Sequence, residues 1–245
     1  MKTSKPLSLL LSLVTALLVV TGSIAVPLLC RSFYYAHIGA MGLAEYTGLS
    51  YEQIQQAYDQ MMDYCLGLRS DFAAGVLPFS QSGASHFADV RGLFRLDLWV
   101  LVLSLAVLAV LFIWCRRKKV RPYCFRGRGP GFWGAVGVGA AFLGIGGLAA
   151  LDFDRAFVIF HSLFFPGKTN WLFDWREDPI ILLLPQEFFR NCAILILTLI
   201  VVWCAILIAA DLWAAGVRRR RRTPPPTCGG CSSEDCSGGP GCQGS

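Results

Sequence analysis

Hydrophobic residues in this chain are gathered into four long blocks, and polar residues fill the segments between them. A helix rises about 1.5 Å per residue and the hydrocarbon layer of a bilayer is roughly 30 Å thick, so a span needs around 20 mostly apolar residues. Asp211 is the only charged residue within the four blocks. The pattern therefore predicts transmembrane helices at residues 7–29, 98–115, 132–151 and 192–215.

The third block is the least continuous, because six glycines dilute its apolar side chains. Small residues at such spacings let helices approach each other closely inside a membrane. We interpret this segment as a packed inner helix. Its glycines are Gly134, Gly137, Gly139, Gly144, Gly146 and Gly147.

The basic residues predict the orientation of the four spans. Of the 22 lysines and arginines, 14 lie in three short segments: before the first block, between the second and third, and after the fourth. Cytoplasmic loops carry the excess of Lys and Arg, so these segments and both chain ends are predicted to be cytoplasmic. The residues are Lys2, Lys5, Arg116, Arg117, Lys118, Lys119, Arg121, Arg126, Arg128 and residues 218–222.

Composition agrees with a membrane protein, since 55% of the residues are hydrophobic and only 16% are charged. The net charge of +6 is explained by the topology and by anionic lipid at the inner leaflet. Nucleic acid is not expected as a partner, because no folded basic face is visible. The sequence thus predicts an all-α integral membrane protein, a four-helix bundle capped by two extracytoplasmic loops.

A cleaved signal peptide is the alternative for the first block, because Ser23 and Ala25 form a small-x-small pattern after a basic start. The apolar run to Leu29 is long for the core of a signal peptide. A lipoprotein signal is less favoured still, since Leu29 stands before Cys30 where a small residue would be expected.

The first outer loop, residues 30–97, contains one segment with helical periodicity. Ser50 and Gln53 form a capping box. Apolar residues that follow fall on one face of the predicted helix, which suggests packing against the rest of the loop or contact with the membrane surface. They are Tyr51, Ile54, Tyr58, Met61, Met62 and Cys65. Farther on, Gly75, Pro78 and Gly83 are expected to interrupt regular structure.

The second outer loop, residues 152–191, is short and rich in aromatic residues. Aromatic rings of this kind match the belt at the membrane–water interface. Asp178 and Pro179 read as the N-cap and first residue of a helix, followed by the apolar run 180–184 that Pro185 ends. This run is too short to span, so it is predicted to be re-entrant or interfacial.

All three histidines lie in the outer loops or at their edges. A histidine near the hydrocarbon boundary is costly to ionise, and imidazole can exchange a proton near pH 7. His86 and Asp89 are three residues apart and would face one another on a helix. His86 and His161 together favour a site over two isolated histidines that merely bond carbonyls. His37 follows the first span directly and is interpreted as interfacial.

The segment after residue 217 is a separate tail of basic residues followed by Pro, Gly, Ser and Cys, a composition that cannot bury a core. We expect residues 218–245 to be disordered and cytoplasmic, with their cysteine thiols reduced. Cys228, Cys231, Cys236 and Cys242 lack the paired spacing of a zinc ribbon, so metal binding is not favoured. Elsewhere, Cys30 and Cys65 both face outward and could pair.

Two motifs resemble the bacterial lipoprotein intramolecular transacylase family, called Lit, whose members are small four-span membrane proteins. One motif is Ser-His-Phe-Ala-Asp-Val at residues 85–90. The other begins Phe-His-Ser-Leu-Phe-Phe at residues 160–165, continues through Asn170 and Trp171, and ends Pro-Gln-Glu-Phe-Phe at residues 185–189. Span number and loop proportions agree too, so the resemblance covers about residues 6–217.

The resemblance implies transfer of the sn-2 fatty acid of a lipoprotein's diacylglyceryl cysteine to that cysteine's own α-amino group, which needs no cofactor. The substrate is then a diacylated lipoprotein within membrane lipid. We assign His161 as general base, and His86, oriented by Asp89, as the group that stabilises the oxyanion or protonates the leaving oxygen, though the two roles could be exchanged. Candidate substrate contacts are Phe164, Phe165, Asn170, Trp171, Asp174, Glu187 and Phe188.

Other functions find less support in the same residues. An acyl-enzyme through Ser85, Ser162 or Cys192 lacks a nucleophile-elbow pattern. A metal hydrolase lacks the His-Glu-x-x-His motif, and a transporter would need charged residues in the middle of a span. The remaining alternative is a non-catalytic sensor or accessory protein whose outer loops bind a lipid or a partner.

Overall fold

The computed structural model describes residues 3–220, and four of its helices are long and apolar enough to cross a membrane. They are α1 (Lys5–Leu29), α5 (Gln81–Lys118), α6 (Pro130–Leu151) and α8 (Gln186–Arg220). Each contains one predicted span. Helices α5 and α8 begin well before their apolar runs, so two of the predicted spans are parts of longer helices.

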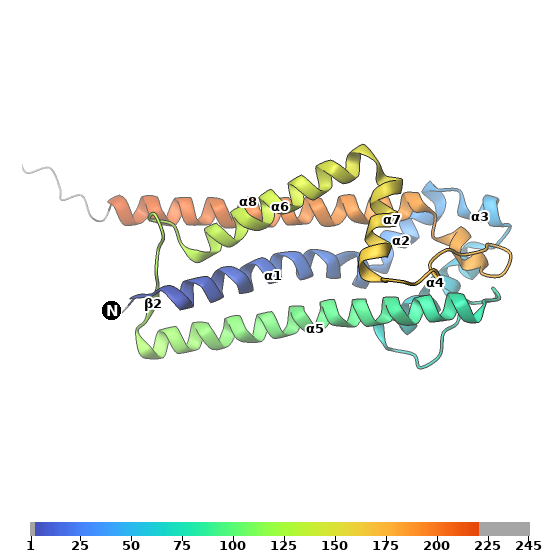
Figure 1. Cartoon of the computed structure of the whole chain (residues 1–245), viewed down its shortest axis with the longest axis horizontal. Coiled ribbons are helices and arrows are strands. Elements are labelled where there is room, and N and C mark those ends of the chain that lie inside the picture. Colours follow the sequence, from blue (N-terminus) through green and yellow to red (C-terminus); the bar gives the residue numbers. More distant parts are fainter. Residues whose placement is uncertain (1–2, 221–245) are drawn as a thin grey trace, which may run out of the picture.

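Helix α1 has the central position in the bundle, because it packs against α5, α6 and α8 (Figure 1). Its buried hydroxyl groups bond to carbonyl groups of the same helix. Thr21 donates to the carbonyl of Leu17 and the buried Ser23 donates to that of Val19, at 2.8 and 2.7 Å. Helix α1 therefore buries small polar residues without leaving a hydrogen-bonding group unpaired.

Helix α6 approaches its neighbours through glycine, as predicted, but it is not the inner helix. A Cβ atom at Gly134 would lie 2.7 Å from the Ser12 carbonyl oxygen of α1, and one at Gly139 would lie 3.6 Å from Cys204 of α8. Several of its large side chains are exposed, including Leu143, Ile145 and Leu148. The glycines thus bring α6 close to α1 and α8, while these large side chains are directed outward, where lipid would lie.

One end of the bundle collects the chain start, the connection between α5 and α6, and the end of α8 (Figure 1). Strand β1 (Thr3–Ser4) pairs in parallel with β2 (Arg121–Pro122) within the described residues. Asp211 of α8 accepts a hydrogen bond from the Gly129 backbone at 2.9 Å and lies 3.6 Å from the Arg128 guanidinium. The one acidic residue in the predicted spans thereby fastens α8 to this connection.

The other end carries the short helices of both predicted outer loops, and we call it the outer end after these loops (Figure 1). Helix α4 (Tyr51–Leu66) has the predicted capping box, and the predicted face is buried except at Tyr51. It packs on α5, on α2 (Arg31–Ala40) and on the 3-10 helix η1 (Pro179–Leu183). Helix α3 (Leu43–Thr47) contacts α2 and η1. Packing within the loop, and not a membrane surface, therefore explains the apolar face of α4.

The apolar run after Asp178 forms the 3-10 helix η1 (Pro179–Leu183). It lies in the hydrophobic core of the outer end, called the outer core, whose buried residues include Tyr34, Ile54, Tyr58 and Phe188. Ile180 and Leu183 are fully buried there, so this run is neither re-entrant nor interfacial. Asp178 stands at the N-cap position but forms no capping bond. Instead its carboxylate accepts bonds from the backbone and hydroxyl of Ser80, both at 2.7 Å, which joins the second outer segment to the start of α5.

Two further predictions concern cysteine. Cys30 is exposed, Cys65 is buried, and both are free, so the pairing considered from the sequence does not occur. The four cysteines of the tail lie outside the described residues.

Candidate active site

His86 and His161 come together at the outer end of the bundle, as the two motifs predicted. Their ring centroids are 5.9 Å apart, and the residues are only 5% and 8% exposed. His86 lies in the second turn of α5, and His161 lies in the last turn of α7 (Phe153–Phe164). Two segments separated by 75 positions thus contribute one proton-exchanging group each to a single buried place.

Helix α7 brings His161 to this place because it turns sharply from α6. Only Asp152 separates the two helices, and its carboxylate caps α7 by accepting a bond from the Arg155 backbone at 2.9 Å. Helix α7 then runs across the end of the bundle instead of along it (Figure 1). Such a crossing directs its last turn toward α5.

The tautomer of neutral His161 is fixed by its own helix. Its Nδ1 lies 2.8 Å from the carbonyl oxygen of Phe157. A carbonyl can only accept, so Nδ1 carries the proton and Nε2 keeps its lone pair. The Trp171 ring stacks on the imidazole at 4.6 Å, and burial lowers the pKa of His161 below its ordinary value. These contacts leave Nε2 as a neutral proton acceptor at pH 7.

His86 is enclosed by aromatic rings. Phe165, Phe173 and Phe87 have their ring centroids at 5.0, 5.4 and 5.9 Å from its imidazole. An uncompensated positive charge is costly in such surroundings. Its Nδ1 atom is buried and has no hydrogen-bond partner among residues 3–220.

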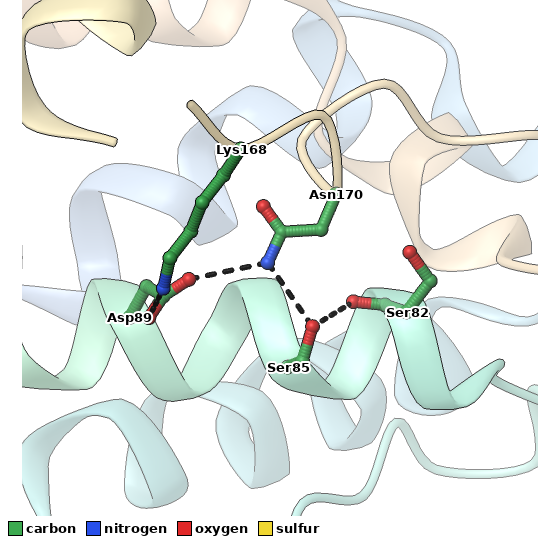
Figure 2. Close-up of polar contacts among 5 residues, drawn as sticks. All are labelled: Ser82, Ser85, Asp89, Lys168 and Asn170. Carbon is green, nitrogen blue, oxygen red and sulfur yellow. Dashed lines mark hydrogen bonds and ion pairs between the residues drawn. The ribbon is translucent and has the colours of Figure 1, made fainter. Parts of the chain in front are cut away.

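Asp89 does not bond His86, although both lie on one helix as expected. Its carboxylate is occupied by the loop that follows α7: Lys168 Nζ lies 2.5 Å from Oδ1, and Asn170 donates to Oδ2 at 3.1 Å (Figure 2). Asn170 also donates to Ser85 Oγ at 3.0 Å. The expected orienting pair is therefore replaced by a network of four residues in which Asp89 holds the loop.

The predicted substrate contacts divide into two groups. Phe165 and Trp171 lie against the two imidazoles, and Asn170 lies beside them. Phe164 is exposed on α7, with its ring 4.7 Å from that of Phe160.

The remaining three predicted contacts lie elsewhere. Asp174 is exposed in a turn and binds the backbone of Arg176. Phe188 is buried in the outer core with its ring 5.6 Å from that of His37. Glu187 lines a separate cavity of about 420 Å³, together with His37 and Asn191. The second motif thus continues past the histidine pair to another part of the outer end.

Among residues 3–220, no three His, Cys, Asp or Glu side chains lie close enough together to hold a metal ion. The site as described consists of imidazole, carboxylate, amide and ammonium groups among aromatic rings. It can move protons and stabilise charge by hydrogen bonding.

A family model described as lipoprotein intramolecular transacylase Lit matches residues 9–189 of this sequence. The chain belongs to the Lit family. The matched range includes both histidines, the network around Asp89 and three of the four candidate membrane helices, as well as the start of the fourth. Lit membership indicates an acyltransferase at family level.

Solved Lit structures have the same fold. The in meso structure of the membrane-integral lipoprotein intramolecular transacylase Lit from Bacillus cereus aligns with a TM-score of 0.76 at 23% identity, covering 89% of this chain and 97% of that one. Variants of the Bacillus cereus protein with one histidine changed to arginine or to alanine each align with a TM-score of 0.72 at 22% identity. They cover 88% and 89% of this chain, and 93% and 94% of theirs. A search of curated proteins gave no match. The likeness confirms a membrane-integral helical fold.

Proposed function

We propose that this Lit family member moves the sn-2 acyl chain of a lipoprotein's diacylglyceryl cysteine to the α-amino group of the same cysteine. The observation that carries the proposal is the buried pair of His86 and His161, 5.9 Å apart between ring centroids. Family membership gives the transacylase class, and the paired imidazoles give that class a means of proton transfer.

The reaction is an ester aminolysis. The amine nitrogen forms a bond to the acyl carbon, the bond from that carbon to the sn-2 oxygen breaks, and the proton lost by the amine is gained by the departing oxygen. His161 suits the base, because its Nδ1 is held by Phe157 and its Nε2 is free to accept. His86 then stabilises the oxyanion or protonates the leaving oxygen.

No enzyme nucleophile is required in this scheme. Amine and ester belong to one molecule, so holding them together supplies a large effective molarity. Ser85 donates to the Ser82 carbonyl and accepts from Asn170, and burial raises the pKa of the Cys65 thiol to about 12. Neither group is activated for attack.

The substrate would reach the pair from the outer leaflet. Phe164, Phe165 and Trp171 present aromatic surface beside the histidines for acyl chains and the glyceryl group. We place this end outside the plasma membrane of a bacterium, with both chain ends cytoplasmic and all four helices crossing the bilayer. The support is the gathering of basic residues at the opposite end.

The test is expression in a bacterium that lacks lipoprotein N-acylation, followed by mass spectrometry of one abundant lipoprotein's N-terminal peptide. Wild type should yield N-acyl, S-monoacylglyceryl cysteine, whereas His86→Asn and His161→Asn should lower the rate about a hundredfold or more. His37→Asn is the matched control, because His37 also bonds a carbonyl in its own helix but lies outside the pair.

The alternative hypothesis, a non-catalytic protein that binds lipid or a partner through its outer end, predicts a different result. Well-expressed wild type would leave the diacylglyceryl form unchanged, and the three histidine variants would be indistinguishable. That outcome would reject the transacylase proposal for this chain.

A further inference from the structure

Two buried polar atoms at the site lack partners, and their chemistry is complementary. Among residues 3–220, His86 Nδ1 and Asn170 Oδ1 are both buried without a hydrogen bond. An imidazole N–H can donate, whereas a carboxamide oxygen can only accept. Buried polar atoms are nearly always paired in folded proteins, so two such atoms at one site call for an explanation.

The orientation of Asn170 is set by its neighbours. Its amide nitrogen donates to Ser85 Oγ at 3.0 Å and to Asp89 Oδ2 at 3.1 Å (Figure 2). A flipped amide would place its oxygen against the Asp89 carboxylate, where two acceptors would repel. The network therefore commits both amide protons to α5 and leaves Oδ1 available to a donor.

Asp89 is itself held in place. Lys168 occupies its Oδ1 atom at 2.5 Å, so the carboxylate meets Asn170 with Oδ2 only. Burial and the neighbouring His161 lower the pKa of His86, whereas Asp89 and the Asn170 side chain act in the opposite direction. The four residues thus form an ordered series from an ammonium group to the imidazole.

We propose that Asn170 is a positioning residue whose Oδ1 accepts the Nδ1 proton of His86, and that Asp89 and Lys168 hold Asn170 for this task. The proposal rests on the proposed function of the histidine pair. His86 then faces substrate with Nε2, the same atom that Phe157 leaves free in His161, and this nitrogen must first gain a proton before it can protonate the leaving oxygen. Asp89 orients His86 through Asn170, in addition to the direct effect of its charge on the imidazole.

The first measurement does not depend on activity. The chain has three histidines, so ¹⁵N-histidine NMR of the full protein in nanodiscs can be assigned with single His→Asn variants. His86 should be the Nδ1–H tautomer in wild type and a mixture of tautomers in Asn170→Ala. A wild-type His86 with its proton on Nε2 would overturn the proposal, whether or not the protein proves to be a transacylase.

The second measurement uses kcat, KM and their pH dependence with a diacylated lipopeptide. Asn170→Ala should lower kcat about tenfold to a hundredfold with little change in KM, because His86 loses its orientation. Burial and the neighbouring His161 lower the pKa of His86 to about 4, and this titration should move to still lower pH in Asn170→Ala, since an acceptor for its N–H is lost. Besides Asn170, the groups acting on His86 are His161, Asp89 and Lys168, all of which remain. Asn191→Ala, at the separate cavity, is the matched control.

A double-mutant cycle decides whether Asp89 acts through Asn170. Asp89→Asn should lower kcat on its own, and its effect should be much smaller in the presence of Asn170→Ala. Full additivity would reject the series. A rise in KM alone for Asn170→Ala, with an unchanged pH profile, would mean that Asn170 binds substrate directly and would also reject it. An inactive wild type would count against the proposed function and leave the NMR result to judge this inference.

Discussion

Two different neighbours control two properties of His161. The Phe157 carbonyl sets which nitrogen carries the proton, because it can only accept. The Trp171 ring covers the imidazole and keeps water from it, and burial lowers the pKa of His161. Phe157 therefore sets the tautomer of His161, and Trp171 helps to keep the imidazole neutral.

We predict a pH profile in which the acidic limb lies below the ordinary histidine pKa of about 6.5. A base with a lowered pKa is neutral at pH 7, so kcat should stay level toward pH 6.5 and fall only at lower pH. Trp171→Ala should expose the imidazole, raise the pKa of His161 and move this limb to higher pH. The measurement is kcat against pH for wild type and Trp171→Ala, and an unmoved limb would exclude His161 as the titrating base.

Single residues also mark the limit of what the sequence could predict. The pairing of His86 with His161 followed from two recognisable motifs. Helical spacing placed Asp89 near His86, yet its bonding partners come from Lys168 and Asn170, about 80 positions later. No local pattern distinguished Lys168, because a long-range ion pair leaves no periodic trace in the sequence.

Among the elements, α5 differs most from its sequence-based prediction. Gly83 suggested an interruption, but it lies in the first turn of α5, where Ser80 caps the helix by accepting from the Gly83 backbone at 2.9 Å. The glycine leaves room for Asp178, whose Oδ1 would lie 2.2 Å from an added Cβ atom. Glycine is needed at position 83 because of a tertiary contact with a residue 95 positions away. Periodicity in the sequence cannot reveal such a contact.

Gly83→Ala should therefore destabilise the outer end of the protein, by about 1–3 kcal/mol on the scale of overpacked sites. Gly92→Ala is its matched control, because it lies in the same helix with nothing within 4 Å of an added Cβ atom. That change should be neutral or slightly stabilising, since alanine favours helix. Thermal unfolding in one detergent would compare the pair, and equal midpoints would contradict the contact with Asp178.

Helix α6 offers a second matched pair. Gly134→Ala should weaken the packing of α6 on α1, because its Cβ atom would meet the backbone oxygen of Ser12 at 2.7 Å. Gly137→Ala should not, since open space surrounds that position. Small residues at helix interfaces in membranes work through such close approach. Resistance to unfolding in a series of SDS concentrations would measure both variants, and a loss in Gly137→Ala equal to that in Gly134→Ala would refute the assignment.

At the scale of the whole molecule, charge and candidate chemistry lie at opposite ends. Basic segments meet where β1 pairs with β2, and the histidine pair lies at the far end of α5 (Figure 1). Apolar blocks and basic segments sufficed to predict the four candidate membrane helices and their relative direction. Which helices pack against one another was not predictable, because their positions depend on side-chain fit that hydropathy does not encode.

The proposed orientation can be tested with two exposed cysteines. Cys30 caps α1 at the end of the bundle that carries the short helices, and Cys124 lies in the connection between α5 and α6. In single-cysteine variants on intact cells, a membrane-impermeant maleimide should label Cys30 and spare Cys124. Both should react after the cells are opened. Labelling of Cys124 in intact cells would reverse the topology.

The unbroken length of α5 ties site geometry to the bilayer itself. With 38 residues, the helix is about 57 Å long, against a hydrocarbon layer of about 30 Å. His86 stands roughly 18 Å beyond the start of the apolar run at Leu98. A tilt of about 10°, well within the range that helices adopt to match membrane thickness, would swing it about 3 Å. His161 is carried by a different pair of helices, α6 and α7, so a change in bilayer thickness would move the two imidazoles by different amounts. We therefore expect the distance between the two imidazoles to depend on the thickness of the surrounding bilayer.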